Sequence, residues 1–503
     1  MSCNLHTLLE AVGIGPSYTC QDVLIESIGC DSRSIKKGEL FFGLSGENVD
    51  GGQFWPQALE AGAAAAVIGT TAAGLDPPCK TDRVIVLPEP VAYWMGEIAS
   101  AFWGKPSSKL TLIGVTGTNG KTTISHLIEH LAIKCGIESA LFGTLVNRWP
   151  KHSEISTHTT SFGDVLHEQL SKSVLSGASL AAMEVSSHAL SQSRVAGCRF
   201  SGAIFTNLTQ DHLDYHDSME KYFEAKSLLF RPPYMEEGHS RAIVNIDDSW
   251  GRLLAERLNQ KCWRASLDTC LIESIKPELF ITDIEMTAKG TAGLLHSPCG
   301  KGRFASPLVG RFNLMNLLEA VGALLQQEIV LNDILYAISS FSGVPGRMEP
   351  IFLDRELPGV IVDYAHTPDG LKNALTTLRD FVSGRIFCVF GCGGDRDRGK
   401  RSQMGSVASK LADSVIITSD NPRSEDQRQI SLDILEGIST DAEVIIENDR
   451  GLAIKETISK ALPGDMVLIA GKGHENYQIL KETTIEFDDR DIARQVLDSI
   501  LTD

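Results

Sequence analysis

Residues 110–134 read LTLIGVTGTNGKTTISHLIEHLAIK, and this stretch decides how the surrounding chain folds. Its first six residues are mostly apolar and predict a buried strand, which ends at the glycine-rich turn 117–120. Ile124, Leu127 and Leu131 then recur at the spacing of a helix that begins at Lys121 and packs on one face. The stretch therefore predicts a strand, a turn and a helix, the framework of an α/β domain.

The turn between the predicted strand and helix has the composition of a phosphate-binding loop. Glycines let the backbone approach a phosphate, and the amides at a helix N-terminus point toward its oxygens. Lys121 supplies a charge for the β- and γ-phosphates, and the Thr122 hydroxyl is suited to ligate Mg²⁺. The usual pattern has a glycine where this chain has Val115, so the loop is a variant. Because an ordinary Gly-Asn turn would not need the Lys-Thr pair, we expect a nucleoside triphosphate to bind here.

The composition limits the class of protein. A chain of 503 residues is expected to form about two to four domains, and its hydrophobic (43%) and charged (22%) fractions are typical of soluble globular proteins. The net charge of −18 argues against a nucleic-acid partner, because a protein that binds nucleic acid would present a basic surface. The 11 cysteines include no C-x-x-C pair, and no signal peptide or membrane-length apolar run is visible. We expect a monomeric cytoplasmic protein with reduced thiols and no membrane contact.

Turn-forming segments at 104–108 and 341–349 divide the chain into three parts, each with alternating strand and helix signals. We expect domains at 1–107, 108–344 and 345–503. In the first part, Ser32 and Arg33 form either a ligand-contacting loop or a turn with a solvated arginine.

Polar residues follow two predicted strands of the middle part. Glu184 lies at the end of the first, where a buried carboxylate must be paired or bind a metal, so it is either an Mg²⁺ ligand or half of a salt bridge. After the second, His212 and His216 stand four residues apart with aspartates between them. That spacing resembles a metal site, but it also suits surface hydrogen bonding.

Three further features of the middle part have ordinary interpretations when each is considered alone. Lys226 looks like an ordinary helical lysine, and 247–248 looks like a solvated loop. Asn313 stands near the start of a predicted helix, where asparagine usually caps the N-terminus.

The last part contains four apolar strands, at 360–364, 386–390, 414–418 and 466–470, as in a parallel sheet covered on both faces. Each precedes a polar loop with Gly, His, Arg or acidic residues. Because the carboxyl ends of parallel strands meet at one edge of a sheet, we expect the four loops to form one composite site.

Ten motifs, taken together and in order, resemble the Mur ligases, ATP-dependent enzymes that form amide bonds in peptidoglycan precursors. The motifs cover nearly the whole chain and read TGTNGKTT, MEVSSHAL, FTNLTQDHLDYH, YFEAKSLLF, GRFN, PGRME, DYAHTPD, GCGGDRDRGKR, DNPR and GKGHE. The resemblance is strongest to the members that add the third residue of the peptide stem. It implies an α/β, three-domain architecture: a UDP-substrate-binding domain, a P-loop-type ATPase domain, and a Rossmann-like domain that binds the amino acid.

The resemblance also implies site residues. Catalysis would rest on Lys121, Glu184, His212 and Lys226. ATP would contact Gly117, Thr118, Asn119, Gly120, Lys121, Thr122, Thr123, Asn313, Arg347 and Asp363. The UDP-muramoyl-dipeptide would contact Ser32, Thr159, Thr160, Ser186, Gln192 and Arg194. Mg²⁺ would be held by Thr122, Glu184, His212 and Lys226, the last as a carbamate.

The variant DNPR resembles that of ligases that use meso-diaminopimelate, for which the resemblance implies binding by Arg396, Asp420, Asn421, Pro422, Arg423, Gly471 and Glu475. Diaminopimelate carries a second carboxylate and amine, which Arg423 and Asp420 are able to pair. L-lysine lacks that carboxylate and would leave the arginine unpaired. The sequence leaves three rival functions open: an L-lysine-adding ligase, a related folate or cyanophycin ligase, and a non-catalytic nucleotide-binding regulator.

Overall fold

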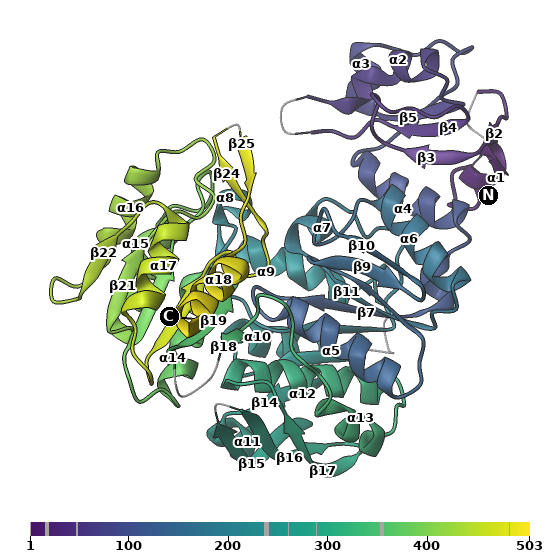
Figure 1. The fold of residues 1–503 in the computed structure, drawn as a ribbon. Helices are drawn as coiled ribbons and strands as arrows, with labels where there is room; N and C mark the ends of the chain where they lie inside the picture. Colours follow the sequence, from purple (N-terminus) through teal and green to yellow (C-terminus); the bar gives the residue numbers. More distant parts are fainter. Residues whose placement is uncertain are drawn as a thin grey trace.

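The computed structural model describes residues 2–15, 20–46, 49–235, 241–259, 261–287, 289–352, 357–481 and 483–502. Three α/β parts, each built on its own sheet, follow one another along the chain. The N-terminal part lies at one end of the central part, and the C-terminal part lies against the side of the central part (Figure 1). The three sheets lie within the three predicted domains, whose boundaries stay a prediction.

The N-terminal sheet has four parallel strands in the order β3-β4-β5-β6. Its strands are β3 (Ser27–Gly29), β4 (Glu39–Phe42), β5 (Ala65–Gly69) and β6 (Val84–Leu87); β1 (Cys3–Asn4) and β2 (Leu24–Ile25) pair separately. The helices are α1 (Leu5–Glu10), η1 (Gly51–Phe54), α2 (Trp55–Glu60), α3 (Thr70–Leu75) and α4 (Val91–Phe102). Leu40 and Phe42 face one apolar cluster and Phe41 faces another, so both faces of the sheet are covered.

The central sheet has eleven strands, in the order β10-β9-β8-β11-β7-β12-β13-β14-β15-β16-β17. The strands are β7 (Thr111–Thr116), β8 (Ser139–Phe142), β9 (Val146–Trp149), β10 (His152–Ile155), β11 (Leu180–Glu184), β12 (Gly202–Phe205), β13 (Ala242–Asn245), β14 (Cys262–Ser266), β15 (Leu279–Thr287), β16 (Gly290–Ser297) and β17 (Gly300–Ser306). The run from β8 to β15 is parallel. Since β7 lies between β11 and β12, the phosphate loop and the polar ends of both neighbours meet at one edge.

Helices cover both faces of this sheet. They are η2 (Pro106–Lys109), α5 (Lys121–Lys134), α6 (Gly163–Leu175), α7 (Ser187–Ser191), α8 (Leu213–His216), α9 (Met219–Ser227), η3 (Leu228–Phe230), α10 (Ser249–Arg257), α11 (Thr269–Ile275), α12 (Arg311–Gln326) and α13 (Leu331–Ile338). The apolar residues predicted on one face of α5 are fully buried in a cluster shared with α12. The turn-forming segment 104–108 overlaps η2, where Pro106 and Ser107 are buried.

The C-terminal sheet has the order β18-β19-β23-β20-β21-β22 and is parallel except for the edge strand β18. Its strands are β18 (Glu349–Phe352), β19 (Gly359–Asp363), β20 (Ile386–Phe390), β21 (Ser414–Ile417), β22 (Val444–Ile446) and β23 (Met466–Ala470); β24 (Tyr477–Leu480) and β25 (Thr483–Glu486) form a hairpin. The helices are α14 (Pro368–Arg379), α15 (Gly399–Leu411), α16 (Gln427–Leu435), α17 (Arg450–Lys460) and α18 (Asp489–Thr502). The four apolar strands predicted here are confirmed.

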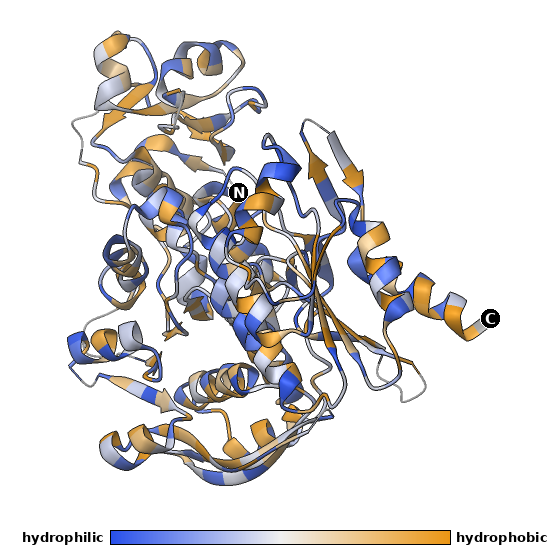
Figure 2. Ribbon diagram, turned by 90° about the vertical axis from the view of Figure 1, so that its left-hand side faces the viewer, coloured by the Kyte–Doolittle hydropathy of each residue, from blue (hydrophilic) through white to orange (hydrophobic). Residues whose placement is uncertain are grey.

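Apolar residues concentrate in the strands and on the helix faces that cover them, while the outer helix faces are polar (Figure 2). Within the described ranges, no helix combines the length and the apolar character that crossing a bilayer requires. All 11 cysteines lie within these ranges, and each is a free thiol.

Candidate active site

The phosphate loop joins β7 to α5, and its backbone requires glycine at two positions. Gly117 and Gly120 have φ angles of +144° and +92°. A Cβ atom at Gly117 would lie 1.9 Å from Thr206 Oγ1, and one at Gly120 would lie 2.4 Å from Asn316 Oδ1. No side chain caps α5, so amides of its first turn point toward the space where a phosphate would bind.

Two lysines converge on the carbonyl groups of this loop. Lys121 Nζ donates to Gly117 O at 2.9 Å and to Thr118 O at 2.8 Å, and Lys226 Nζ donates to Gly117 O at 2.8 Å. Lys226 is 1% exposed, so its interpretation as an ordinary helical lysine is wrong. Burial and the charge of Lys121 hold the pKa of Lys226 well below its usual value, so that its amine tends toward the neutral form.

Glu184, at the end of β11, is fully buried beside the loop. Its carboxylate accepts hydrogen bonds from Thr122 Oγ1 at 3.1 Å, Thr144 N at 2.9 Å and Thr144 Oγ1 at 3.0 Å. These donors are neutral, and the structural salt bridge considered from sequence finds no partner among the described residues. The Thr122 hydroxyl and the Glu184 carboxylate thus place two oxygen ligands next to each other, which fits an Mg²⁺ ion that takes its other ligands from phosphate and water.

Of the two histidines after β12, His216 is buried, whereas the His212 side chain is 40% exposed. His216 Nε2 lies 2.9 Å from Ser187 Oγ, and the ring centroids of His212 and His188 are 4.8 Å apart. Burial, with positive groups nearby, lowers the pKa of His212 to about 3, so its ring is neutral. No cluster of three or more His, Cys, Asp or Glu side chains arranged to hold a metal occurs in the described part of the chain. The metal site suggested by the spacing of the two histidines therefore stays a prediction.

The predicted contacts to the muramoyl-dipeptide form a connected network next to Glu184. Thr160 Oγ1 donates to Glu184 O at 2.9 Å and accepts from Ser186 N at 3.1 Å. Arg194 donates to Thr160 O at 3.2 Å, and its guanidinium lies 4.1 Å from the centroid of the Phe162 ring. Two members complete the network: Gln192 Oε1 accepts from Arg194 Nε at 2.9 Å, and Thr159 Oγ1 accepts from Thr144 Oγ1 at 3.1 Å.

Ser32 lies in the N-terminal part, apart from this network. Its neighbour Arg33 is paired with Asp31 at 2.8 Å, and the Arg33 side chain is 87% exposed. The two residues form a turn with an exposed arginine, and contact of Ser32 with a ligand stays a prediction.

Arg347 and Asp363 lie at the junction between the central and C-terminal parts. Arg347 Nη2 donates to Thr122 Oγ1 at 3.2 Å, and its guanidinium lies 4.5 Å from the centroid of the Tyr364 ring. Asp363 accepts from Met348 N at 2.6 Å, and burial raises the pKa of its carboxyl group.

Asn313 does not cap its helix. The N-cap of α12 is Gly310, and Asn313 lies inside the first turn, 3% exposed, where it donates to Val309 O at 2.9 Å. The predicted capping role is wrong because the helix begins earlier than the asparagine. With Arg347, Asn313 lines a pocket of about 280 Å³.

The loop 247–248 is also not simply solvated, contrary to its interpretation from sequence. Asp248 caps α10 by accepting from Gly251 N at 2.9 Å, and it also accepts from Leu208 N at 3.3 Å. Asp247 accepts from Ser266 Oγ at 2.5 Å. These contacts tie the end of β13 to its neighbours.

The C-terminal part closes directly onto the phosphate loop. Asn119 Nδ2 donates to Asp369 Oδ2 at 3.2 Å. Asp211, which is 5% exposed, lies 3.7 Å from His366 and 3.6 Å from Lys400. Although burial opposes ionisation, these two partners hold the pKa of Asp211 well below its usual value. Asp211, His366 and Lys400 all lie in the sequence motifs, but nothing in the spacing of the motifs indicated that these residues meet across the domain junction.

A cavity of about 900 Å³ lies between the two parts. Loops from β19, β20, β21 and β23 all line it, so the predicted composite site is confirmed as a structural feature. Of the predicted diaminopimelate contacts, the lining includes Arg396, Asp420, Asn421, Arg423, Gly471 and Glu475 but not Pro422. Thr159 and His212 line it from the central part.

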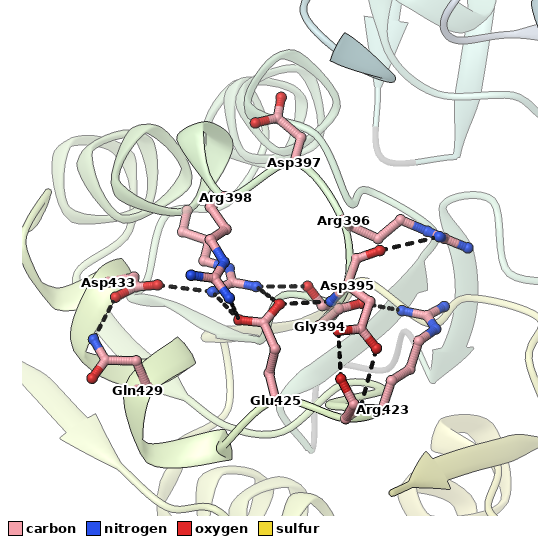
Figure 3. Close-up of polar contacts among 12 residues, drawn as sticks. Gly394, Asp395, Arg396, Asp397, Arg398, Arg423, Glu425, Gln429 and Asp433 are labelled. Atoms are coloured by element: carbon pink, nitrogen blue, oxygen red, sulfur yellow. Dashed lines mark hydrogen bonds and ion pairs between the residues drawn. The ribbon is translucent and has the colours of Figure 1, made fainter. Parts of the chain in front are cut away.

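Charged and amide groups are linked within the C-terminal wall of this cavity. Glu475 accepts from Asn421 Nδ2 at 2.8 Å and from Lys472 Nζ at 3.0 Å. Lys472 is fully buried and lies 3.9 Å from Asp420. Arg423 Nη1 donates to Gly394 O at 2.8 Å (Figure 3).

A phosphate loop in a parallel sheet, closed by a second parallel sheet whose polar loops line a cavity beside it, is the arrangement of a nucleotide-dependent enzyme. Comparison with known families is specific. The Mur ligase middle domain matches residues 115–324, the glutamate ligase domain of Mur ligases matches 346–473, and the Mur ligase family catalytic domain matches 24–103. The chain belongs to the Mur ligase family, and it is an ATP-dependent ligase that forms amide bonds.

Its relatives include two cyanobacterial proteins named UDP-N-acetylmuramoyl-L-alanyl-D-glutamate--2,6-diaminopimelate ligase. The one from a strain of Prochlorococcus marinus is 64% identical over 99% of both chains. The one from Synechococcus elongatus is 48% identical over 98% of this chain and 99% of the relative. A solved structure of a ligase of the same name has a TM-score of 0.67 and 36% identity over 95% of each chain.

Proposed function

We propose that this ligase adds meso-diaminopimelate to UDP-N-acetylmuramoyl-L-alanyl-D-glutamate in peptidoglycan precursor synthesis. The observation that carries the proposal is the single cavity into which Asp420 and Arg423 open from the C-terminal part and His212 opens from the central part. The relatives that match the full chain are named for this pair of substrates.

The first chemical step would activate the substrate carboxylate, which is a poor electrophile. Its oxygen attacks the γ-phosphorus of ATP, the bond to the β–γ bridging oxygen breaks, and ADP leaves. Both reactants are anions, so the transfer needs positive charge, which Lys121 is placed to supply beside the amides of α5. The amine of the third amino acid then attacks the acyl phosphate, and phosphate leaves as the amide forms.

Water must be excluded during this sequence because acyl phosphates hydrolyse. The contacts of Asp211 with His366 and Lys400, and of Asn119 with Asp369, hold the C-terminal part over the phosphate loop. We infer that the closed arrangement is the one in which the reaction occurs.

Magnesium would be held by Thr122 and Glu184, with His212 and the carbamate of Lys226 on the substrate side, and would neutralise phosphate charge. Lys226 suits carbamylation because burial favours its neutral amine, which is the form that combines with carbon dioxide. The nucleotide would contact the phosphate loop, Asn313, Arg347 and Asp363.

The muramoyl-dipeptide would lie along Thr159, Thr160, Ser186, Gln192 and Arg194, with its uridine nucleotide toward Ser32. The proposed domains are 1–107, 108–344 and 345–503, acting as a monomer in the cytoplasm.

Selection of diaminopimelate over L-lysine would come from its second amino-acid centre. Arg423 would pair the distal carboxylate and Asp420 the distal amine, while Arg396, Asn421, Gly471 and Glu475 hold the rest. With lysine the arginine would stay unpaired, which is the kind of mismatch that gives strong discrimination.

The test is ADP release by the purified protein with ATP, Mg²⁺ and UDP-N-acetylmuramoyl-L-alanyl-D-glutamate, with either meso-diaminopimelate or L-lysine added. Turnover with diaminopimelate alone supports the proposal. Turnover with lysine would keep the ligase and discard the specificity argument. Turnover only with a folate or cyanophycin acceptor would point to a ligase of that kind, and no turnover at all would point to a non-catalytic regulator.

A further inference from the structure

Two loops of the C-terminal part contact each other beside the cavity. The loop 391–398 follows β20 and carries Arg396, and the loop 418–426 follows β21 and carries Arg423. Gly394 N donates to Asn421 O at 3.0 Å, so the two loops are also joined through their main chains. Both arginines line the cavity, and their guanidinium groups lie to the right of Asp395 in Figure 3, away from Glu425 and Asp433.

The carboxylate of Glu425, a residue of the loop 418–426, contacts the loop 391–398. It accepts from Asp395 N at 2.6 Å and from Arg401 at 2.9 and 3.1 Å, and it lies 3.0 Å from Arg398. Arg401 is fully buried and also donates to Asp433 Oδ2 at 2.8 Å. Glu425 is not among the described residues that line the cavity, so it acts on the site only through its neighbours.

The loops adopt conformations that need this support. Asp395 and Arg423 have φ angles of +53° and +51°, in the left-handed region that side chains other than glycine rarely adopt. Such conformations persist only where the surroundings hold them. Asp395, next to Arg396, is held by Glu425 and by Ser424, whose Oγ donates to Asp395 Oδ1 at 2.7 Å. Arg423 stands two residues before Glu425.

We propose that Glu425 is a positioning residue that sets the affinity and the choice of the amino-acid substrate, by fixing the backbone from which Arg396 and Arg423 reach the cavity. The proposal rests on the function proposed above. An arginine pairs a carboxylate through two parallel hydrogen bonds, so a small displacement of its backbone weakens both bonds together.

The test compares Glu425→Gln with Asp413→Asn. Asp413 resembles Glu425 in accepting from an arginine (Arg379, 2.8 Å) and from a backbone amide (Ile386 N, 2.7 Å), but it lies at the opposite end of β20 and β21. For E425Q we expect the KM for meso-diaminopimelate to rise about tenfold. The KM values for ATP and the UDP-substrate should change by less than about twofold. The ratio of kcat/KM for meso-diaminopimelate to kcat/KM for L-lysine should fall. For D413N we expect lower thermal stability and unchanged KM values.

A folded E425Q whose KM for diaminopimelate is unchanged, or whose KM values all rise together, overturns the proposal. If E425Q does not fold, Ser424→Ala weakens the same junction and is measured in the same way, with an unchanged KM again overturning it. The wild-type protein tests the proposed function separately. If it uses only L-lysine, that function fails, and Glu425 is then judged by the KM for lysine.

Discussion

The phosphate loop and the paired loops after β20 and β21 are stabilised in different ways. The phosphate loop uses glycine at its left-handed positions, and Lys121 bonds to carbonyls three and four residues away. The paired loops place Asp395 and Arg423 at left-handed positions and depend on contacts between residues 24 to 30 positions apart. The first conformation therefore carries no side-chain strain at its left-handed positions, whereas the second is strained at Asp395 and Arg423 and depends on contacts between the loops of two neighbouring strands.

This difference leads to a functional expectation. Every acceptor needs phosphoryl transfer, so damage to the phosphate loop should lower the rate with all substrates. The paired loops contact one substrate, so damage there should affect that substrate alone. If a substitution in the phosphate loop impaired the reaction with one substrate only, or a substitution in the paired loops impaired it with all of them, the two regions would not be independent.

The largest effect is expected from Lys121→Met, which removes the charge beside the transferred phosphate. ADP release should fall at least about 10³-fold with every acceptor while the protein stays folded. Lys134→Met, at the exposed end of the same helix, is the control and should keep normal turnover. If ADP release fell with one acceptor only, the proposed difference between the phosphate loop and the paired loops would be wrong.

Lys226→Arg should lower turnover about 10²-fold, because arginine cannot form the carbamate. With ¹³C-labelled bicarbonate, the wild-type protein should give a carbamate signal in NMR spectra that this variant lacks. Lys221, exposed on the same helix, provides the control variant Lys221→Arg, which should retain the signal. A wild-type protein without the signal at full activity would refute the modification.

Arg423→Lys should act on one substrate only. Losing one of two parallel hydrogen bonds to a charged partner costs about 1.5–3 kcal/mol, so kcat/KM for diaminopimelate should fall roughly 10- to 100-fold. The KM for ATP should stay the same, and Arg428→Lys, at an exposed position nearby, should be neutral. An equal loss with every amine would discard the assignment of Arg423.

The smallest effect concerns His126, a buried histidine on α5, the helix that follows the phosphate loop. Burial lowers its pKa to about 4. Between about pH 6 and 4 the unfolded chain binds a proton at His126 that the folded chain does not, so the free energy of unfolding falls as pH falls.

The His126 contribution is about 1.4 kcal/mol per pH unit in that range. Denaturant unfolding at pH 6 and pH 5 should show a smaller pH dependence for His126→Gln than for the wild-type protein. His152→Gln, at an exposed histidine, should keep the wild-type dependence. Parallel curves for all three proteins would show that His126 is not held neutral.

The sequence predicted much of this molecule because its motifs are contiguous. The strand, turn and helix at 110–134 and the four apolar strands of the C-terminal part were all predicted, and so was the meeting of their loops at one site. The interpretation of Lys226 was wrong because its depth of burial cannot be obtained from its nearest neighbours in the sequence. The interpretation of Asn313 was wrong because those neighbours do not show where the helix begins.

By itself, the sequence determined the α/β class, the phosphate loop and the family, because short-range spacing and glycine placement specify them. Only the tertiary structure decided that Asp211 meets His366 and Lys400 across the junction, and that Glu425 links two loops. The physical reason is that an ion pair between distant segments depends on the order of strands in a sheet and on how two domains close. Neither of these leaves a periodic signal in the chain.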